Sequence, residues 1–527
     1  ISKSRFLLSV SLILLITGMV SSNSDVSESL FLQLQAFLSS YFGWMIILLA
    51  NGFLIFSIYL LFTKHKNIRL GGPEAKPSYS YVNWIAMLFS AGLGIGLLFY
   101  GVAEPVMHMN SYPGMIDGNN SYNASKAINL ANLHWGLHGW AIYSALGLCF
   151  AFASYNKKLP FRVSSLLGKK VASNKYLAIA IDVIAILTTV FGITTSLGLG
   201  AMQISAGMSH IFGIEESFTN YVYIIIVITL LGLTSVSLGL NAGIKKLSQV
   251  NMAIATCLLL LVFALGPTVF ILNSLVQNFG AYINTVIQSA TWTEAYDTTS
   301  WQNGWTLFYF TWWFAWAPFV SLFIARISYG RTVKEFIIGV LFVPSFIVFI
   351  WMGVFGNAAI YQVINNTSEI SQIVANNMNV ALFTLYDAYP FAQPLSVVSL
   401  ILIVTFFVTS SDSGALVASM LSSKKQTDIN DDSPILSRVT WAILLGIVAA
   451  VLLYAGGLTA LQTSVVITGV PFEFDFTLSY NLSLIYLSIF GSVFGFSLYL
   501  TLIKKIGSND AAYVAIIMPL IALLVST

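Results

Sequence analysis

Apolar stretches of about 20 residues follow one another along nearly the whole chain, separated by short polar segments. A helix needs roughly 20 consecutive apolar residues to cross a bilayer. Stretches that approach or exceed this length are 6–21, 42–62, 79–100, 129–155, 176–208, 221–239, 249–275, 305–327, 336–360, 395–421, 439–458, 480–503 and 510–526. The pattern predicts an all-α polytopic membrane protein with about 12–13 transmembrane segments. The first stretch, which follows Lys3 and Arg5, is also compatible with a signal peptide, and we favour a retained helix.

The composition supports the same class of protein. Hydrophobic residues occupy 57% of the 527 positions and charged residues only 8%, whereas a soluble domain carries roughly 25% charged residues. Cys149 and Cys257 both lie in apolar stretches, and their spacing is typical of neither a disulfide framework nor a metal site. The composition therefore excludes a soluble domain. We expect a lipid membrane as a partner, and no nucleic acid.

The positive charges indicate which side of the membrane each connection faces, because cytoplasmic connections carry an excess of Lys and Arg. Of the 23 Lys and Arg residues, only Lys126 lies in one set of alternate connections. That set consists of 22–41, 101–128, 209–220, 276–304, 361–394 and 459–479. The other connections are therefore predicted to be cytoplasmic, and so is the N-terminus.

Two of the apolar stretches contain residues that interrupt helices. Gly92, Gly94 and Gly96 alternate with bulky residues in 79–100, and each glycine disfavours a helix interior by about 1 kcal/mol. Pro318, in the stretch 305–327, removes a backbone hydrogen bond. Interrupted helices at corresponding positions of two halves indicate the binding site of a secondary transporter, and these two lie five helices apart. The alternative for the glycines is close helix packing through small residues.

Aromatic residues are concentrated on single helix faces beside or just after these interruptions. The two sets are Trp135, Trp140 and Tyr143, and Trp312, Trp313 and Trp316. Either set alone is compatible with ordinary packing. Together they are typical of an aromatic cage, in which ring faces attract a quaternary ammonium group that cannot donate a hydrogen bond. We therefore expect Gly92, Gly94, Gly96 and the two aromatic sets to bind such a solute.

A group of hydroxyl-bearing residues in 395–421 is a candidate cation site. Phe406, Thr409 and Ser410 share one helix face, and oxygen ligands suit a hard monovalent cation. The alternative is that the hydroxyls bond their own helix backbone. Asp412 is an acidic residue in or near the membrane, which by default suggests a function. It is a candidate either for a gating ion pair with Arg326 or for proton carriage.

Several segments resemble the betaine/choline/carnitine transporter (BCCT) family. They are FSAGLGIGLLFYGVAEP, HWGLHGWAIY, FGITTSLGLGAMQIS, TWWFAWAPFVSLFIARISYGRTVKEF and FFVTSSDS, and the resemblance extends over about residues 5–470. It implies a LeuT-like fold, as in sodium-coupled amino-acid transporters. Two N-terminal helices with a cytoplasmic loop (1–78) would precede two inverted five-helix repeats (79–275 and 276–470).

The resemblance also implies an activity. A member would import a quaternary-ammonium compatible solute such as glycine betaine, choline or carnitine by alternating access, with a role in osmoprotection. It would lie in the bacterial inner (plasma) membrane, commonly as a homotrimer. Osmotic gating is not predicted, because the charged cytoplasmic tail that senses osmotic stress in some members has no counterpart here.

Residue roles follow from the resemblance position by position. Trp135, Trp140, Tyr143 and Trp313 would form the central aromatic box. Trp312 and Trp316 would line the entry and exit sides of the path. The sodium site would use the carbonyl groups of Ser90, Leu93 and Phe406 and the hydroxyl groups of Thr409 and Ser410.

The resemblance is uneven at the positions that concern ion coupling. A second sodium site in some members would correspond to Thr189 and Phe319, but Ile193 stands where those members have a second threonine. A sodium-independent exchanger of the family has Arg at the position of Asn251 and Met at the position of Val320, and neither is present here. We therefore predict sodium symport, with sodium as the coupling ion and no cofactor. The alternative is proton-coupled import of the choline type.

The C-terminal segment 471–527 departs from this family and resembles the end of EamA-type drug/metabolite transporters. A natural fusion or a chimeric gene model would each explain this change. If the segment replaces the last helix of the second repeat, function could suffer even with all the sites in place.

Two other classes of protein are alternatives. His134 and His138 lie one helical turn apart, a metal-ligand spacing, with Glu104 as the nearest acid, so a membrane-embedded metalloenzyme is conceivable. A channel would need a polar ring rather than an aromatic box. Neither a channel nor an enzyme would show sodium-dependent concentrative uptake.

Overall fold

The computed structural model describes residues 2–92, 94–167, 169–239, 243–297, 299–423 and 433–469, and the regular secondary structure in this part of the chain is helical. Ten of its helices are long and apolar enough to span a membrane, or eleven spans with one bent pair. The prediction of an all-α polytopic membrane protein is thus confirmed. The predicted segments 480–503 and 510–526 lie outside the described residues, so the predicted total of 12–13 is not tested.

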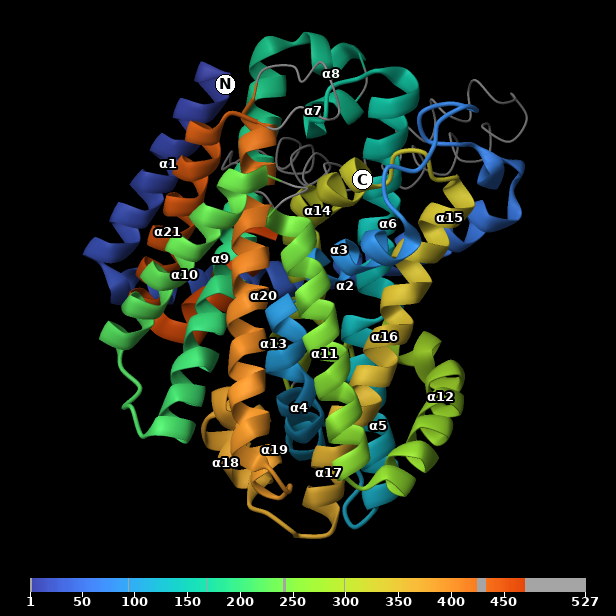
Figure 1. The fold of residues 1–527 in the computed structure, drawn as a ribbon, viewed down its shortest axis with the longest axis vertical. Helices are drawn as coiled ribbons and strands as arrows, with labels where there is room; N and C mark the ends of the chain where they lie inside the picture. Colours follow the sequence, from blue (N-terminus) through green and yellow to red (C-terminus); the bar gives the residue numbers. More distant parts are fainter. Residues whose placement is uncertain are drawn as a thin grey trace.

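The spanning segments form an elongated bundle (Figure 1). They are α1 (Lys3–Ser22), α2 (Ser24–Phe62), the bent pair α3 (Tyr81–Gly92) and α4 (Gly94–Ser111), α5 (Asn120–Trp135) with α6 (Leu137–Ala151), α9 (Lys175–Phe212), α10 (Phe218–Gly239), α11 (Lys245–Leu265), α13 (Trp301–Gly304) with α14 (Thr306–Ile327), α15 (Val333–Ile337) with α16 (Val343–Trp351) and α17 (Asn357–Ile364), α20 (Ala392–Leu421) and α21 (Ile435–Gly469). Short helices cap the ends of the bundle, namely α7 (Val163–Leu166) and α8 (Lys169–Ser173) at the top of Figure 1 and α18 (Ile370–Asn376) and α19 (Ala381–Asp387) at the bottom.

The predicted interruption at the glycines is confirmed. The chain bends by 65° between Tyr81–Ser90 and Gly94–Ser111. Gly94 has φ +31°, a region that residues with a Cβ rarely adopt. A Cβ at this position would also lie 3.1 Å from Oγ of Ser410. The break therefore needs glycine for its backbone conformation, and a Cβ would also lie tightly against Ser410 on α20.

The predicted interruption at Pro318 is wrong. α14 runs from Thr306 to Ile327 as one helix with Pro318 inside it, and every other residue of α14 is buried. Proline removes one backbone hydrogen bond, but a membrane helix tolerates the loss where neighbouring groups surround it. α14 packs against α6, α9 and α21. Only one of the two expected broken helices is present in the described residues, and the division into repeats at 79–275 and 276–470 stays a prediction.

A second difference concerns the predicted segment 249–275. α11 ends at Leu265, and a separate helix, α12 (Thr268–Thr291), begins inside that stretch and continues into the expected loop 276–304. Pro267 explains the break, because a residue before proline avoids the helical region, and Gly266 is extended at ψ −164°. α12 packs against α5 at the edge of the bundle (Figure 1).

The segment after α14 holds the start of α3 in place. The Arg331 guanidinium lies 4.0 Å from the ring centroid of Tyr81 and 4.8 Å from that of Trp84. Trp84 donates its indole N–H to Oγ of Ser328 at 2.9 Å. Gly330 has φ +79°, and a Cβ there would overlap the backbone at Lys76. These contacts connect α3, the first half of the broken helix, to the end of α14.

At the N-terminus, α1 packs against α9 and α21. Nε of Arg5 forms an ion pair with Asp182 at 2.6 Å, and Asp182 also accepts hydrogen bonds from the backbone and hydroxyl of Ser164.

Candidate solute and cation sites

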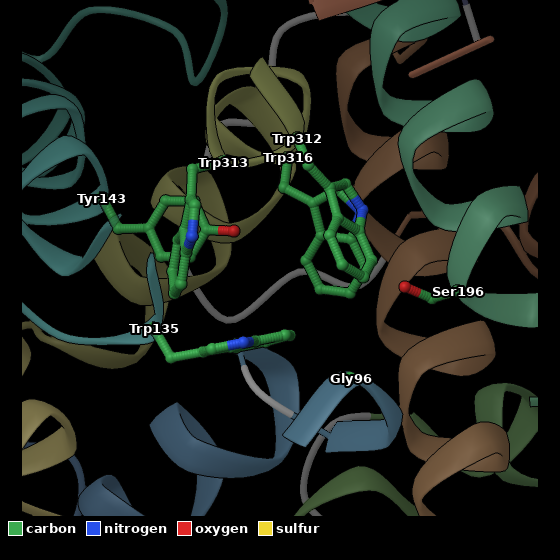
Figure 2. Close-up of a pocket in the computed structure, with 8 residues that line it drawn as sticks. Gly96, Trp135, Tyr143, Ser196, Trp312, Trp313 and Trp316 are labelled. Carbon is green, nitrogen blue, oxygen red and sulfur yellow. The ribbon is translucent and has the colours of Figure 1, made fainter. Parts of the chain in front are cut away.

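A pocket with about 290 Å³ of empty space lies at the break between α3 and α4 (Figure 2). Its lining comes from α3, α4, α5, α6, α9 and α14, as Gly92, Gly96, Trp135, Tyr143, Ser196, Trp312, Trp313 and Trp316.

The rings surround this space rather than stacking into a solid core. Trp135 lies nearly perpendicular to Trp312 and Trp313, at ring-centroid distances of 5.9 and 6.2 Å. Tyr143 lies 4.7 Å from Trp313, and Trp316 lies 6.2 Å from Trp312. Figure 2 shows Tyr143 and Trp313 on one side, Trp312 and Trp316 on the other, and Trp135 below. The two aromatic sets that we identified separately in the sequence thus meet around one pocket.

Trp140 stands behind this lining. Its ring lies 5.8 Å from that of Trp313 and 5.7 Å from that of Tyr143, and it is fully buried. It does not line the pocket. In this conformation Trp140 supports two of the rings that do.

The indole N–H groups orient several of the rings. Trp313 donates to the carbonyl of His134 at 2.8 Å, and Trp316 donates to the carbonyl of Gly192 at 2.6 Å. Trp135 donates to Oε2 of Glu104 at 2.7 Å. Because these polar edges are bonded to protein, the rings are fixed in position around the pocket.

Glycines allow the indoles to approach neighbouring backbone closely. A Cβ would lie 2.6 Å from Trp140 at Gly92, 2.4 Å from Trp135 at Gly96, 2.2 Å from Trp313 at Gly139 and 2.8 Å from Trp316 at Gly192. Cβ atoms essentially never approach other atoms this closely. The glycines of the broken helix therefore have a second role as contact surfaces for the rings. We did not predict Gly139 or Gly192, although both lie in segments that carried the family resemblance.

The candidate cation site lies where the break meets α20. The position of a Cβ on Gly94 is 3.1 Å from Oγ of Ser410 and about 4 Å from side-chain atoms of Phe406. The Ser90 hydroxyl is buried and has no hydrogen-bond partner among the described residues. Leu93, whose carbonyl was expected to be a ligand, lies outside the described residues. Ser90, Phe406 and Ser410 thus come from the elements expected to form the site.

Thr409 forms other interactions in this structure. Its Oγ1 lies 2.9 Å from the carbonyl oxygens of Thr405 and Phe406, as in the alternative in which the hydroxyl bonds its own helix. It also accepts a hydrogen bond from Nδ2 of Asn251 at 2.9 Å. Asn251 therefore holds the Thr409 oxygen from α11.

The two residues predicted for a second sodium site, Thr189 and Phe319, are both buried. The Thr189 hydroxyl on α9 is buried without a partner among the described residues. Phe319 is fully buried and packs edge-on against Trp316 at 5.6 Å. Ile193 packs against Gly414, with its Cδ1 2.4 Å from where a Cβ would be. The position of the missing threonine is thus filled by an apolar contact with α20.

The predicted gating ion pair between Arg326 and Asp412 stays a prediction, and in this conformation the two side chains have other partners. Asp412 accepts hydrogen bonds from the hydroxyls of Ser235 and Ser413. Nη1 of Arg326 lies 3.2 Å from Sδ of Met420. Met420 is eight residues beyond Asp412 in the same helix, about 12 Å along its axis, so the two charged groups lie at different depths.

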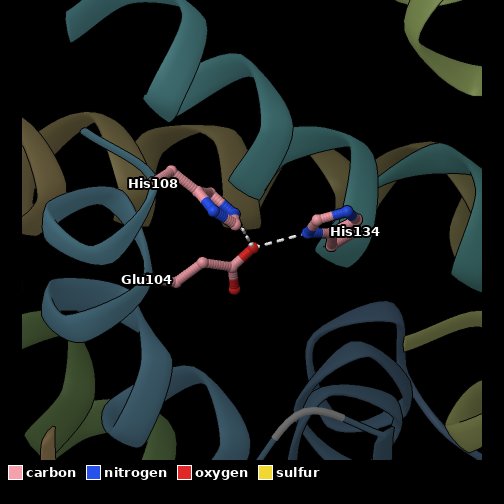
Figure 3. A group of neighbouring side chains, drawn as sticks. All are labelled: Glu104, His108 and His134. Atoms are coloured by element: carbon pink, nitrogen blue, oxygen red, sulfur yellow. Dashed lines mark hydrogen bonds and ion pairs between the residues drawn. The ribbon is translucent and has the colours of Figure 1, made fainter. Parts of the chain in front are cut away.

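One buried cluster contains potential metal ligands. Oε1 of Glu104 lies 3.0 Å from Nε2 of His108 and 2.6 Å from Nδ1 of His134 (Figure 3). These three residues each offer a ligand atom within 4.8 Å of the others. His138, expected as the partner of His134, instead lies 3.2 Å from Asn51 through Nε2. Glu104, the nearest acid in the sequence, thus lies beside His134, whereas His138 is not part of this cluster.

Ser196 is a pocket residue that sequence reasoning missed. It is a hydroxyl among aromatic rings, and Figure 2 shows its oxygen directed toward Trp312 and Trp316. A serine on a helix carries little signal by itself, because most such hydroxyls bond their own backbone. Its segment, FGITTSLGLG, was noted only for its family resemblance.

Known transporters of one family match most of this chain. The model of the BCCT family, betaine/carnitine/choline transporters, matches residues 5–487. The glycine betaine transporter of Acinetobacter baylyi is 38% identical over 90% of this chain and 71% of its own length. The glycine betaine transporter OpuD of Bacillus subtilis is 40% identical over 86% of this chain and 88% of its own. An uncharacterized transporter of Mycobacterium tuberculosis is 43% identical over 85% of this chain and 76% of its own.

Two further results concern the C-terminal end of the family match and the similarity to solved structures. The family match continues to residue 487, past the predicted boundary at 470, and the likeness of 471–527 to EamA-type transporters finds no support in these comparisons. Among solved structures, a mutant manganese transporter of Eremococcus coleocola matches with a TM-score of 0.40 and 13% identity over 87% of this chain and 95% of its own. That similarity is too low to argue from.

Proposed function

Because the chain belongs to the betaine/carnitine/choline transporter family, we propose that it imports a small quaternary-ammonium solute by sodium symport and alternating access. Members of this family are transporters and not enzymes, and the chain is a multi-pass protein of the bacterial plasma membrane. The observation that carries the proposal is the pocket whose aromatic rings are backed by glycines.

The lining of the pocket favours a permanently methylated cation. Its eight residues include five aromatic side chains and no carboxylate. A trimethylammonium group has no N–H to donate, so it gains nothing from hydrogen-bond acceptors and is attracted by ring faces, with up to about 2 kcal/mol for a desolvated contact. A primary amine would lose its hydrogen bonds to water on entering this pocket.

The carboxylate of a zwitterionic solute would have other partners in the pocket, at the N-terminus of α4 and at Ser196. α4 begins at Gly94, and Gly96 lines the pocket, so the N-terminus of an 18-residue helix lies at the break. Helix N-termini attract anions through free N–H groups and the helix dipole. The Ser196 hydroxyl adds a donor on the same side of the pocket as Trp312 and Trp316. A carboxylate held near Ser196 and a methylated nitrogen held by the rings describe glycine betaine, the solute in the names of two relatives.

Sodium coupling is supported by the oxygen atoms beside the break. Ser410 and Ser90 offer hydroxyl oxygens, as a hard monovalent cation prefers, where the halves of the broken helix meet α20. The Phe406 carbonyl would add a third oxygen ligand. Movement of α3 and α4 would then alter the cation and solute sites together. Asp412, buried and bonded to Ser235, is the observation that keeps proton coupling as the second candidate.

Two further features belong to this proposal. We expect a homotrimer on the basis of the family resemblance. We expect a cytoplasmic N-terminus because of the distribution of Lys and Arg. Crosslinking in native membranes tests the first, and labelling of a cysteine placed near the N-terminus tests the second.

The experiment that tests the proposed function is uptake of labelled glycine betaine by the purified full chain in proteoliposomes. Separate sodium, potassium and proton gradients identify the coupling ion, and competition by choline, carnitine and dimethylsulfoniopropionate ranks the solutes. Concentrative uptake that needs inward sodium is the expected result. Uptake that follows only the proton gradient would favour the second candidate, and equilibration without concentration would indicate a channel.

A further inference from the structure

A buried carboxylate lies directly behind the aromatic pocket. Glu104 on α4 is fully buried, and each of its oxygens has two partners. Oε2 accepts the indole N–H of Trp135 at 2.7 Å and the hydroxyl of Tyr309 at 2.5 Å. Oε1 lies within hydrogen-bonding distance of His108 and His134 (Figure 3). A buried acid of this kind is costly unless its hydrogen bonds are satisfied, and here every side of the carboxylate is occupied.

These partners connect the carboxylate to the rings of the pocket. Tyr309 stacks on His134 at 4.7 Å and lies 5.3 Å from Trp135 and 6.2 Å from Trp312. The carbonyl of His134 accepts the indole N–H of Trp313. Three of the pocket indoles therefore have a direct or next-neighbour contact with a partner of Glu104.

The cluster also reaches the point where α14 begins. His134 contacts the hydroxyl of Thr306, the first residue of α14, at 3.0 Å through Nε2. His108 packs against Trp305 at a ring-centroid distance of 4.5 Å, and Trp305 is the non-helical residue between α13 and α14. The cluster thus connects α4, α5 and the start of the helix that carries three of the pocket indoles.

We propose that Glu104 is a positioning residue for the solute pocket, acting through Trp135 and Tyr309. The inference rests on the proposed function and adds a residue that lies outside the pocket lining. Hydrogen bonds from both donors to one carboxylate oxygen fix the plane of the Trp135 indole and the position of Tyr309 beside it. The ring faces are then already oriented before the solute arrives, which lowers the entropic cost of binding.

Two other uses of the cluster are less consistent with the contacts. As a metal site, its three ligand atoms are close enough together, but Oε1 already has both histidines within 3.0 Å, and Oε2 is taken by Trp135 and Tyr309. As a proton carrier, Glu104 would have to give up hydrogen bonds that orient the pocket in each cycle. The test below separates both from a positioning role.

The first variant is Glu104→Gln, in the full chain. Glutamine has the same shape, but one of its two polar atoms is an NH₂ group, which cannot accept the hydrogen bonds of one pair of donors. We expect the KM for glycine betaine to rise about tenfold, because hydrogen bonds to a charged group are among the stronger ones. Vmax and the accumulation ratio at a fixed sodium gradient should stay within about twofold, since the positioned rings act on binding.

A double-variant cycle tests whether Glu104 acts through its partners. Trp135→Phe keeps a ring but removes the N–H, and Tyr309→Phe removes only the hydroxyl. If Glu104 positions these rings, combining Glu104→Gln with either change should raise KM by clearly less than the product of the two single effects. Asp182→Asn is the matched control, because Asp182 is an equally buried acid that instead bonds Arg5 and Ser164, and its KM should be that of the wild type.

Size-exclusion profiles and thermal unfolding show which variants fold. If Glu104→Gln does not fold, Tyr309→Phe decides the question with the same KM measurement. An unchanged KM in the folded variants, or effects that multiply independently, would overturn the inference. So would loss of sodium-driven accumulation at unchanged KM, which indicates coupling, or inactivation of the wild type by a chelator, which indicates a metal. If the wild type itself binds no quaternary-ammonium solute, the proposed function fails instead.

Discussion

The break between α3 and α4 and the helix α14 line the same pocket by different means. At the break, Gly94 adopts φ +31°, and glycines at 92 and 96 leave room for indole rings. This region contributes backbone and space. α14 remains helical through Pro318 and contributes three indoles from one turn of helix. The difference indicates that one broken helix is enough for this pocket. The break supplies the N-terminus of α4, and the side chains of the continuous helix α14 supply the indole rings.

The largest expected effect concerns the side-chain half of this comparison. Trp313→Leu removes the ring that Tyr143, Trp135 and Trp140 surround and whose N–H bonds His134. Uptake of glycine betaine should fall below detection while the protein still folds. Proteoliposome uptake and size-exclusion chromatography measure the two properties. Normal transport by this variant would remove the aromatic cage from the mechanism.

The next effect concerns the backbone half. Gly94→Ala places a Cβ in a conformation that costs roughly 1–3 kcal/mol outside glycine and 3.1 Å from Oγ of Ser410. We expect uptake to fall about tenfold or more, with a weaker apparent affinity for sodium. Gly280→Ala is the matched control, because a Cβ there meets nothing within 4 Å. Equal activity in the two variants would mean that the break does not depend on Gly94.

A smaller effect tests whether the break between α3 and α4 forms part of a sodium site. Ser410→Ala removes the hydroxyl nearest to Gly94, and we expect the sodium concentration for half-maximal uptake to rise several-fold, by about 1 kcal/mol. The KM for solute at saturating sodium should change little. Sodium titrations at fixed solute give the first value. A change confined to solute KM would place Ser410 in the solute site instead.

The smallest effect concerns Pro318. Because α14 is already continuous there, Pro318→Ala should restore one backbone hydrogen bond without altering the pocket. We expect uptake within about twofold of wild type and an equal or higher unfolding temperature. Loss of transport by Pro318→Ala would show that the proline is needed in another conformation of the transport cycle. α14 would then be interrupted in that conformation, as α3 and α4 are here.

The spanning helices and the interruption at the glycines could be predicted from the sequence because both depend on local composition. A bilayer requires long apolar stretches, and Gly94 disfavours a regular helix whatever surrounds it. Pro318 was misleading because tertiary packing decides whether a membrane helix tolerates proline. α12 was missed as a helix because polar residues interrupt its apolar ones every few positions. Apolar residues such as Phe279 and Ile283 are nevertheless exposed on it.

For the candidate site, the sequence by itself determined which residue types gather on each helix face: the two sets of aromatic rings, the three glycines, and the hydroxyls of Thr409 and Ser410. Helix periodicity is enough for that, because it needs only neighbours within a few turns. The tertiary structure decided which faces meet. It brought Ser196 to the pocket, placed Glu104 and Trp140 behind it, and gave Arg326 and Asp412 other partners. These relations join helices far apart in the chain, and the register and tilt that bring such helices together depend on the packing of all of them at once.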